Sequence, residues 1–322
     1  MSIRTKTFCI ITAIVIVITA SSMIISITSA QGQILQTLEN DMLLVATLAN
    51  EYVSGEIDLL KANASTVAQL LKTTGFMQTQ LVLMEQVAAY SDYFTAITIF
   101  NNDGGIDASF GTAPAPVEMA HGRYGQQAFA GHRVMSSSRM DDSGNLVFHV
   151  FVPMDDYHFR AIIGDPDPNP KIIACTVPGD YFSKRVSRFQ IWDTGNITMV
   201  DSEGIIIANV QNQLVTDRLD LTYLAQQEKQ INDAVRVMQR MISGEFSADR
   251  FMANGSDAVV AFMPISASHD RWSIAVIAPV TESPFNNIFT ILLISGLAVM
   301  GLGLIAAAFA SGIIIKLIKN TE

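Results

Sequence analysis

The chain has few charged residues. Of its 322 residues, 16% are Asp, Glu, Lys or Arg, against about 25% in an ordinary soluble domain. The deficit is concentrated in two stretches, Phe8 to Ala30 and Ile288 to Ile315, which contain no charged residue. Each stretch exceeds the roughly 20 apolar residues that span a bilayer. The sequence therefore predicts two transmembrane helices and disfavours a disordered chain, a fibrous repeat and a plain soluble enzyme.

Basic residues are scarce between the two apolar stretches. The chain ends carry Arg4, Lys6, Lys316 and Lys319 with one acid, Glu322, whereas the segment between the stretches has 16 basic and 29 acidic residues, a net charge of −13. Cytoplasmic flanks of membrane spans are enriched in Lys and Arg. Both termini are therefore predicted to lie on the cytoplasmic side of the plasma (inner) membrane, and the acidic segment on the extracytoplasmic side. An acidic segment also disfavours nucleic acid and anionic lipid as partners.

The first apolar stretch has a second interpretation, because a charged start followed by an apolar run also describes a cleaved signal peptide. The run here is 23 residues long, whereas a signal core has about 7 to 15. The length favours an uncleaved anchor.

Cysteine is nearly absent. Cys9 lies in the first apolar stretch and Cys175 in another apolar run, so no disulfide framework is expected. The chain also lacks a P-loop, a Gly-x-Ser-x-Gly elbow and a His-Glu-x-x-His sequence. We predict neither an enzyme nor a cofactor.

Metal-ligand spacing is lacking as well. Five histidines are scattered along the chain: His121, His132, His149, His158 and His269. Asp165, Asp167 and Asn169 alternate with prolines but lack the glycine and distant glutamate of a calcium loop. The sequence predicts no metal site. Residues Asp155 to Pro170 are instead predicted to form a rigid surface loop.

An internal duplication organises the segment between the apolar stretches. Ile97 to Ser109 matches Ile197 to Asn209, with five of thirteen pairs identical. Each copy is a β-branched or aromatic run, a polar four-residue turn that closes on Gly104 or Gly204, and a second short strand. This pattern is typical of a β-hairpin.

A second correspondence follows in the same order. His149 to Pro153 matches Val260 to Pro264, and Ile173 to Pro178 matches Ile274 to Pro279. Proline cannot donate to a strand ladder and marks strand ends. Both copies are therefore predicted to end in two strands that stop at prolines.

Helical periodicity fills much of the rest. Ile34 to Leu71 contains no proline and is predicted to form a long helix with an apolar stripe of Leu38, Met42, Val45, Ala49, Tyr52, Leu59 and Leu70. Thr222 to Ile242 is predicted to form an amphipathic helix whose stripe holds Leu224, Ile231, Val235, Met238 and Met241 or Ile242. A shorter helix is expected near Arg123 to Ala130. We expect Trp272 to pack on the Thr222 to Ile242 helix as core.

The predicted fold class is α+β, a long N-terminal helix followed by two tandem antiparallel-sheet modules between two transmembrane helices. The expected boundaries are residues 1–30 for the cytoplasmic start and first span, 31–75 for the long helix, 76–184 and 185–282 for the two modules, and 283–322 for the second span and short end.

This order of parts resembles the double Cache sensor domain of bacterial transmembrane receptors, which has two tandem PAS-like modules. The residues that carry the resemblance are Ile97 to Ser109, Tyr124 to Gly131 with its Gly-His-Arg exit, Ile197 to Asn209, Ala261 to Ile265 and Arg271 to Ala275. The resemblance implies that the membrane-distal first module binds a small molecule and that the long helix pairs two copies into a homodimer.

The best-known subgroup of that family binds amino acids, and this sequence departs from its pattern. His121 stands where the family has an arginine, Arg123 where it has a tryptophan, and Thr176 where it has an aspartate, while Tyr124 matches. Without a carboxylate to pair with an ammonium, the resemblance implies a small carboxylate or another small metabolite rather than a free amino acid.

Polar residues on strands of the first module are further candidates. In the segment 133–140, alternation puts Ser136 and Ser138 on one strand face and Arg139 on the other. Unpaired buried polar groups cost about 1 to 3 kcal/mol, so a polar ligand could satisfy them, or the strand is a solvated edge. His149 is either a satisfied core histidine or a ligand contact. The predicted ligand-binding residues are Tyr124, Ser138, Arg139, His149 and Thr176.

The sequence therefore favours a receptor input unit that senses a small molecule outside the membrane and passes the signal inward. The output domain is expected to be absent from this chain, and a sensor histidine kinase is favoured over a chemoreceptor as the parent. The alternative is a stand-alone membrane-anchored binding or assembly protein that does not signal.

Overall fold

The structure is a computed structural model, which describes residues 3–72, 78–154, 170–218, 232–253, 256–268, 270–283 and 286–319. It divides into two compact units, one of residues 1–41 and 280–322 and one of residues 42–279. The predicted loop over Asp155 to Pro170 lies, apart from Pro170, outside the described residues.

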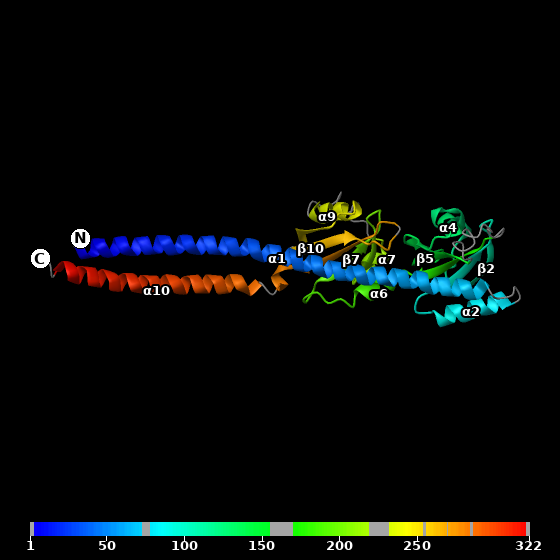
Figure 1. Ribbon diagram of the computed structural model, residues 1–322, viewed down its shortest axis with the longest axis horizontal. Helices are drawn as coiled ribbons and strands as arrows, with labels where there is room; N and C mark the ends of the chain where they lie inside the picture. Colours follow the sequence, from blue (N-terminus) through cyan, green and yellow to red (C-terminus); the bar gives the residue numbers. More distant parts are fainter. Residues whose placement is uncertain are drawn as a thin grey trace, which may run out of the picture. The chain divides into compact units, whose positions relative to one another are not determined.

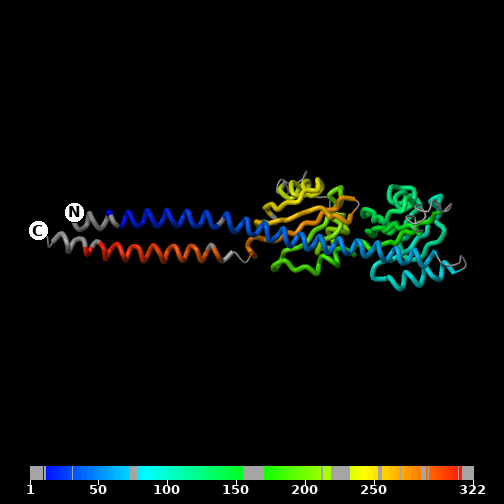
Figure 2. Tube along the Cα trace, viewed as in Figure 1, coloured from blue at the N-terminus to red at the C-terminus, as the bar shows by residue number. Residues whose placement is uncertain are grey.

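The first unit contains two apolar helices. The N-terminal part of α1 (Ile3–Lys72) lies beside α10 (Asn286–Lys319), as Figure 2 traces. Both are long and apolar enough to cross a membrane. A Cβ on Gly296 would come within 2.9 Å of Met23 Sδ, and one on Gly303 within 3.2 Å of Val15 Cγ1. Small residues at these positions let the two helices pack closely.

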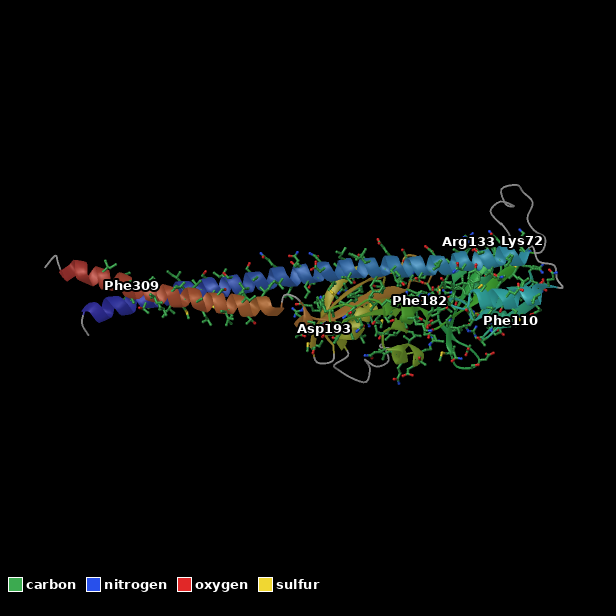
Figure 3. The ribbon with its side chains drawn as sticks, turned by 90° about the horizontal axis from the view of Figure 1, so that it is seen from below. Lys72, Phe110, Arg133, Phe182, Asp193 and Phe309 are labelled. Atoms are coloured by element: carbon green, nitrogen blue, oxygen red, sulfur yellow. The ribbon has the colours of Figure 1, made fainter. Side chains whose placement is uncertain are left out.

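Large apolar side chains project outward from this helix pair. Phe309 of α10, which is labelled in Figure 3, is 72% exposed. Leu302 and Ile25 are similarly exposed. Exposed apolar side chains over a whole helix are typical of a segment surrounded by lipid.

The long helix buries a continuous stripe in the second unit. The buried positions recur every three or four residues: Met42, Ala46, Ala49, Val53, Ile57, Leu60, Ala64, Val67 and Leu71. The predicted stripe was wrong in part, because Leu59 and Leu70 are 39% and 44% exposed and Val45 and Tyr52 are only partly buried. Apolar residues line more than one face of this helix, so spacing alone allows two stripes, and the sheets bury one of them.

The second unit contains two antiparallel sheets. The first module's strands are β1 (Ala96–Phe100), β2 (Ile106–Gly111), β3 (Val134–Met135), β4 (Arg139–Met140), β5 (Leu146–Pro153) and β6 (Ile172–Pro178). The second module's strands are β7 (Asn196–Val200), β8 (Ile206–Asn209), β9 (Ser247–Ala253), β10 (Ser256–Pro264) and β11 (Ser273–Pro279). The orders are β2-β1-β6-β5-β3, with β4 also on β5, and β8-β7-β11-β10-β9. The predicted α+β fold, the two modules and the proline-ended strands are confirmed.

The duplicated hairpins close in the same way. The side-chain oxygen of Asn101 accepts hydrogen bonds from the backbone N–H groups two and four residues later, and Asp201 does the same in the second module. Gly104 and Gly204 adopt φ of 78° and 84°, values that favour glycine. Asp141 repeats this arrangement between β4 and β5. The turn sequence therefore determines three hairpins of this unit.

Helices cover the sheets (Figure 1). The helix α4 (Arg123–Phe129) packs through Tyr124 and Ala128 on Phe151 of the first sheet. The helix α9 (Asn232–Ile242) packs on the second sheet. The remaining elements are α2 (Thr79–Ala89), α3 (Val117–His121), α6 (Tyr181–Val186), α7 (Asn212–Thr216) and the 3-10 turn η3 (Val280–Glu282).

The predicted helix over Thr222 to Ile242 is described only from Asn232 onward, and Leu224 and Ile231 lie outside the described residues. Within α9, Val237 is buried and Val235 is only partly buried. The predicted stripe was therefore wrong at Val235, because Val237 is the residue that continues the face of Met238 and Met241.

Candidate functional site

Two cavities adjoin the first sheet. One, of about 180 Å³, is lined by Ala113, Pro114, Pro116, Arg139, Asp141, Asp142, Ser143, Val147 and His149. The other, of about 340 Å³, shares Ala113, Asp141 and Val147 with it and reaches Asp180 and the α7 residues Val215 and Thr216. Of the predicted ligand-binding residues, the structure thus brings Arg139 and His149 to one cavity.

His149 is the buried polar wall of the smaller cavity. His149 is 1% exposed, and its Nε2 atom has no hydrogen-bond partner among the described residues. Its Nδ1 atom lies 3.2 Å from the hydroxyl oxygen of Thr176, which donates to the carbonyl oxygen of Ala113 at 2.9 Å. The Thr176 hydroxyl donates its one proton to the Ala113 carbonyl. Its oxygen can therefore only accept from His149, so Nδ1 is the protonated ring nitrogen. Nε2 therefore offers a bare lone pair.

The imidazole stays neutral. Burial lowers the pKa of His149 to about 3, and the positive charge of Arg139 adds to the effect. A neutral ring in a cavity is a hydrogen-bond acceptor at Nε2 and carries no charge at physiological pH.

Charged groups line the cavity beside this ring. Arg139 lies on β4, opposite Val147 of β5, and makes no ion pair with a described residue. Asp141 begins the following turn, and hydrogen bonds from the N–H groups of Asn145 and Ser143 hold the pKa of its carboxyl below the usual range. A guanidinium without a carboxylate partner can bind an acidic group.

Ser138 and Thr176 lie near this cavity without lining it. The hydroxyl of Ser138 is buried and has no partner among the described residues. The neighbouring Ser136 hydroxyl is satisfied, because it accepts from the N–H of His149 at 2.9 Å and donates to the carbonyl of Ser137. The segment is thus not a solvated edge strand.

Tyr124 is committed to protein partners. Its ring stacks on Phe151 with centroids 6.4 Å apart. Its hydroxyl donates to the carboxylate of Asp270 in the second module and accepts from the backbone N–H of Ser137 at 2.9 Å and from Arg123 Nη2 at 2.5 Å. Its pKa is raised by burial and by the Asp270 carboxylate. A contact between Tyr124 and a ligand stays a prediction.

Trp272 corrects one sequence-based expectation. The ring is buried, but it packs on Phe148 and Phe182 with centroids 5.4 and 5.6 Å away. These two residues belong to the first module and to α6, so Trp272 contributes to the junction between modules. The prediction that it packs on the Thr222 to Ile242 helix was wrong, because periodicity within one copy carries no information about contacts between copies.

No sequence pattern indicated Asp270 or the cavity wall formed by Ala113, Pro114 and Pro116. Asp270 lies in the loop between β10 and β11, which is shorter than the matching connection between β5 and β6, and no motif in the sequence marked it. The turn that begins at Asp141 could have been found, because Asp-Asp-Ser-Gly resembles the turn sequences before Gly104 and Gly204. Within the described residues, no cluster of three His, Cys, Asp or Glu side chains could hold a metal ion.

Solved structures with this arrangement include the ligand-binding domains of chemoreceptors and the extracellular domain of a histidine kinase. The ligand-binding domain of the Pseudomonas fluorescens chemoreceptor CtaA in complex with L-isoleucine matches with a TM-score of 0.56 and 15% identity over 78% of this chain and 96% of its own. That of the Pseudomonas aeruginosa chemoreceptor PctB in complex with L-Arg matches with a TM-score of 0.55 and 16% identity over 84% and 99%. The extracellular domain of mmHK1S-Z3, assigned to the histidine kinases, matches with a TM-score of 0.55 and 14% identity over 80% and 97%.

At this identity the structures show a shared fold. No curated protein gives a significant sequence match. The family model of the Cache domain, by contrast, matches residues 26–284, which covers α1 from residue 26 onward and both sheets. The chain therefore belongs to the Cache domain family of ligand-sensing domains.

Proposed function

We propose that this chain is the extracytoplasmic small-molecule sensor of a transmembrane receptor and that its ligand binds in the cavity of the first module. The observation that carries the proposal is the buried His149 ring, whose Nε2 lone pair has no described partner. A buried acceptor without a partner costs about 1 to 3 kcal/mol. Because the atom itself is buried, a ligand would remove this cost by displacing the neighbouring side chains and donating a hydrogen bond to Nε2.

The cavity's groups indicate the ligand's chemistry. Arg139 would pair with a carboxylate in charge-assisted hydrogen bonds, and the Nε2 atom of His149 would accept from a hydroxyl or an amide N–H. Thr176 stands where amino-acid-binding relatives are expected to have an aspartate, so a buried partner for an ammonium is missing at that position. We infer a small carboxylate with a hydrogen-bond donor, such as a hydroxy acid.

An amino acid is the second candidate ligand. The CtaA and PctB domains are described in complex with L-isoleucine and L-Arg. In this chain Asp141 and Asp142 line the cavity and could face an ammonium. Asp142 is exposed and Asp141 is already bound by two N–H groups, so both would bind an ammonium weakly in water.

The membrane arrangement and the partners complete the proposal. Two apolar helices and basic chain ends support two spans with both termini cytoplasmic. A homodimer through α1 is supported by exposed leucines on that helix, Leu44 and Leu48 among them. The parent receptor that we favour is a sensor histidine kinase, and a chemoreceptor is the second choice. A stand-alone anchored binding protein is the alternative, and it would bind the same ligand without changing the helix pair.

Thermal-shift screening of the full chain in detergent tests the ligand class. The probes are glycolate, lactate and malate, with propionate as the matched acid that lacks the hydroxyl and L-isoleucine as the amino acid. A site ligand at 100 times its dissociation constant stabilises by about 2.7 kcal/mol. We expect a hydroxy acid to raise the melting temperature more than propionate does. Stabilisation by L-isoleucine alone, or by none of the probes, would contradict the proposed ligand class.

A further inference from the structure

A carboxylate is buried at the junction between the two modules. Asp270, between β10 and β11 of the second module, is 7% exposed. Arg123 Nη2 lies 2.9 Å from its Oδ1 atom, and the hydroxyl of Tyr124 donates to its Oδ2 atom. Both partners begin α4 of the first module. A buried charge is tolerated only when such partners satisfy it, so Asp270 requires the first module in this position.

The same tyrosine reaches the segment beside the cavity. Its hydroxyl oxygen accepts from the N–H of Ser137 at 2.9 Å and lies 3.0 Å from the Ser137 hydroxyl. Ser137 stands between Ser136, whose hydroxyl accepts from the N–H of His149, and the strand that begins at Arg139. Hydrogen bonds thus connect Asp270 through Tyr124, Ser137 and Ser136 to the backbone N–H of His149, and Arg139 follows two residues after Ser137 in the same segment.

A second contact between the modules starts from the same strand. Arg139 lines the cavity, and the adjacent Met140 packs on the apolar core of the second module. Leu146, at the other side of the turn, is 8% exposed and belongs to that core. A shift of β4 that moves Arg139 therefore changes packing in the second module.

The loop at residues 265–272, of which His269 lies outside the described residues, contacts several other elements. Lys61 of α1 donates to the carbonyl of Ala267 at 2.9 Å. Trp272 packs on Phe148 and on Phe182, which is labelled in Figure 3. One loop of the second module therefore contacts α4, β5, α6 and α1.

We propose that Asp270 is a positioning residue that couples the cavity of the first module to the second module through Tyr124 and Ser137. In this arrangement the second module holds the segment before Arg139 in its binding geometry, and a ligand that displaces that segment acts on the loop at residues 265–272. The coupling works in both directions, because linkage between two sites is reciprocal. That this coupling relays a ligand signal rests on the proposed function. The test of the coupling itself uses no ligand, so the two can fail separately.

The test is backbone amide exchange on the full chain in detergent, with three variants and a control. Asp270→Asn removes the charge and keeps the shape, Tyr124→Phe removes only the hydroxyl, and the third variant carries both changes. Asp107→Asn is the matched control, because Asp107 pairs with Lys171 at 2.6 Å on the first module's surface, away from the junction.

We expect Asp270→Asn to speed exchange of the amides at residues 136–139 about tenfold, within the 5- to 150-fold range typical of coupled sites. Tyr124→Phe should give a similar change there and also speed exchange at residues 265–268. The double variant should match the single variants, because all three break one connection. The control should leave both segments unchanged.

Three results would overturn the proposal. Faster exchange confined to residues 265–272 in Asp270→Asn would mean that the loop and the cavity segment are independent. A uniform increase over both modules would mean that Asp270 supports stability in general. If Asp270→Asn does not fold, Tyr124→Phe alone tests the coupling. The substitution lies in the first module, so faster exchange at residues 265–268 of the second module requires a connection across the junction. A missing change there would refute the coupling.

Discussion

The hydroxyl of Tyr124 in the first module donates a hydrogen bond to the carboxylate of Asp270 in the second module. This contact joins residues that lie 146 positions apart in the sequence. It places the tyrosine that the family resemblance implied as a ligand contact at the junction of the two modules. The residue thus serves the structure of both modules, and the cavity that holds His149 and Arg139 lies along the neighbouring strands.

His149 should make stability depend on pH. Its pKa is lowered to about 3 in the folded chain, against about 6.5 when unfolded. The unfolded state therefore binds a proton that the folded state does not, and His149 lowers the free energy of unfolding by about 1.4 kcal/mol for each pH unit below about 6.5, down to about pH 3. We expect His149→Leu to flatten the profile in this window, measured by denaturant unfolding. An unchanged slope would contradict the neutral buried ring.

Leu146 should stabilise the second module although it belongs to the first. Its side chain is part of the core that contains Met241 and Phe262. Leu146→Ala should cost about 2 to 4 kcal/mol, because it leaves a cavity in a packed core. Leu81→Ala on α2 is the control, since Leu81 is 53% exposed. Calorimetry should show a lower melting temperature for Leu146→Ala only, and equal effects of the two changes would mean that the modules do not share a core.

Membrane topology is predicted from the basic chain ends. In a Cys9→Ser background, where Cys175 is buried, a cysteine placed at Ser143 should react with an impermeant maleimide in intact cells. Cysteines placed at Ser2 or Thr321 should react only after the cells are permeabilised. Labelling of either terminus in intact cells would contradict the arrangement with both termini inside.

Much of the fold was predictable because it depends on local rules. The hairpins at Gly104 and Gly204 follow from turn chemistry, and the strand ends at Pro153 and Pro264 follow from the missing N–H of proline. The buried stripe of α1 was only half predictable. Its register depends on which face the sheets cover, and residues such as Leu59 are apolar but exposed.

The candidate site was predictable in part. His149 and Arg139 were chosen from strand alternation, and both line the cavity. Asp270 and the role of Trp272 could not be foreseen, because they depend on how two modules pack on each other. Such contacts leave no periodic pattern in one sequence, and only the three-dimensional arrangement brings them together.

The measurement that tests the account most directly is calorimetric titration of the full chain with the hydroxy acid that gives the largest thermal shift. Arg139→Gln should weaken binding at least about tenfold, since a charge-assisted hydrogen bond contributes about 1.5 to 3 kcal/mol. Arg133→Gln is the matched control, because Arg133 is exposed and does not line either cavity. We expect weakened binding in the first variant and unchanged binding in the second. Equal affinity in the wild type and Arg139→Gln would contradict ligand binding in this cavity.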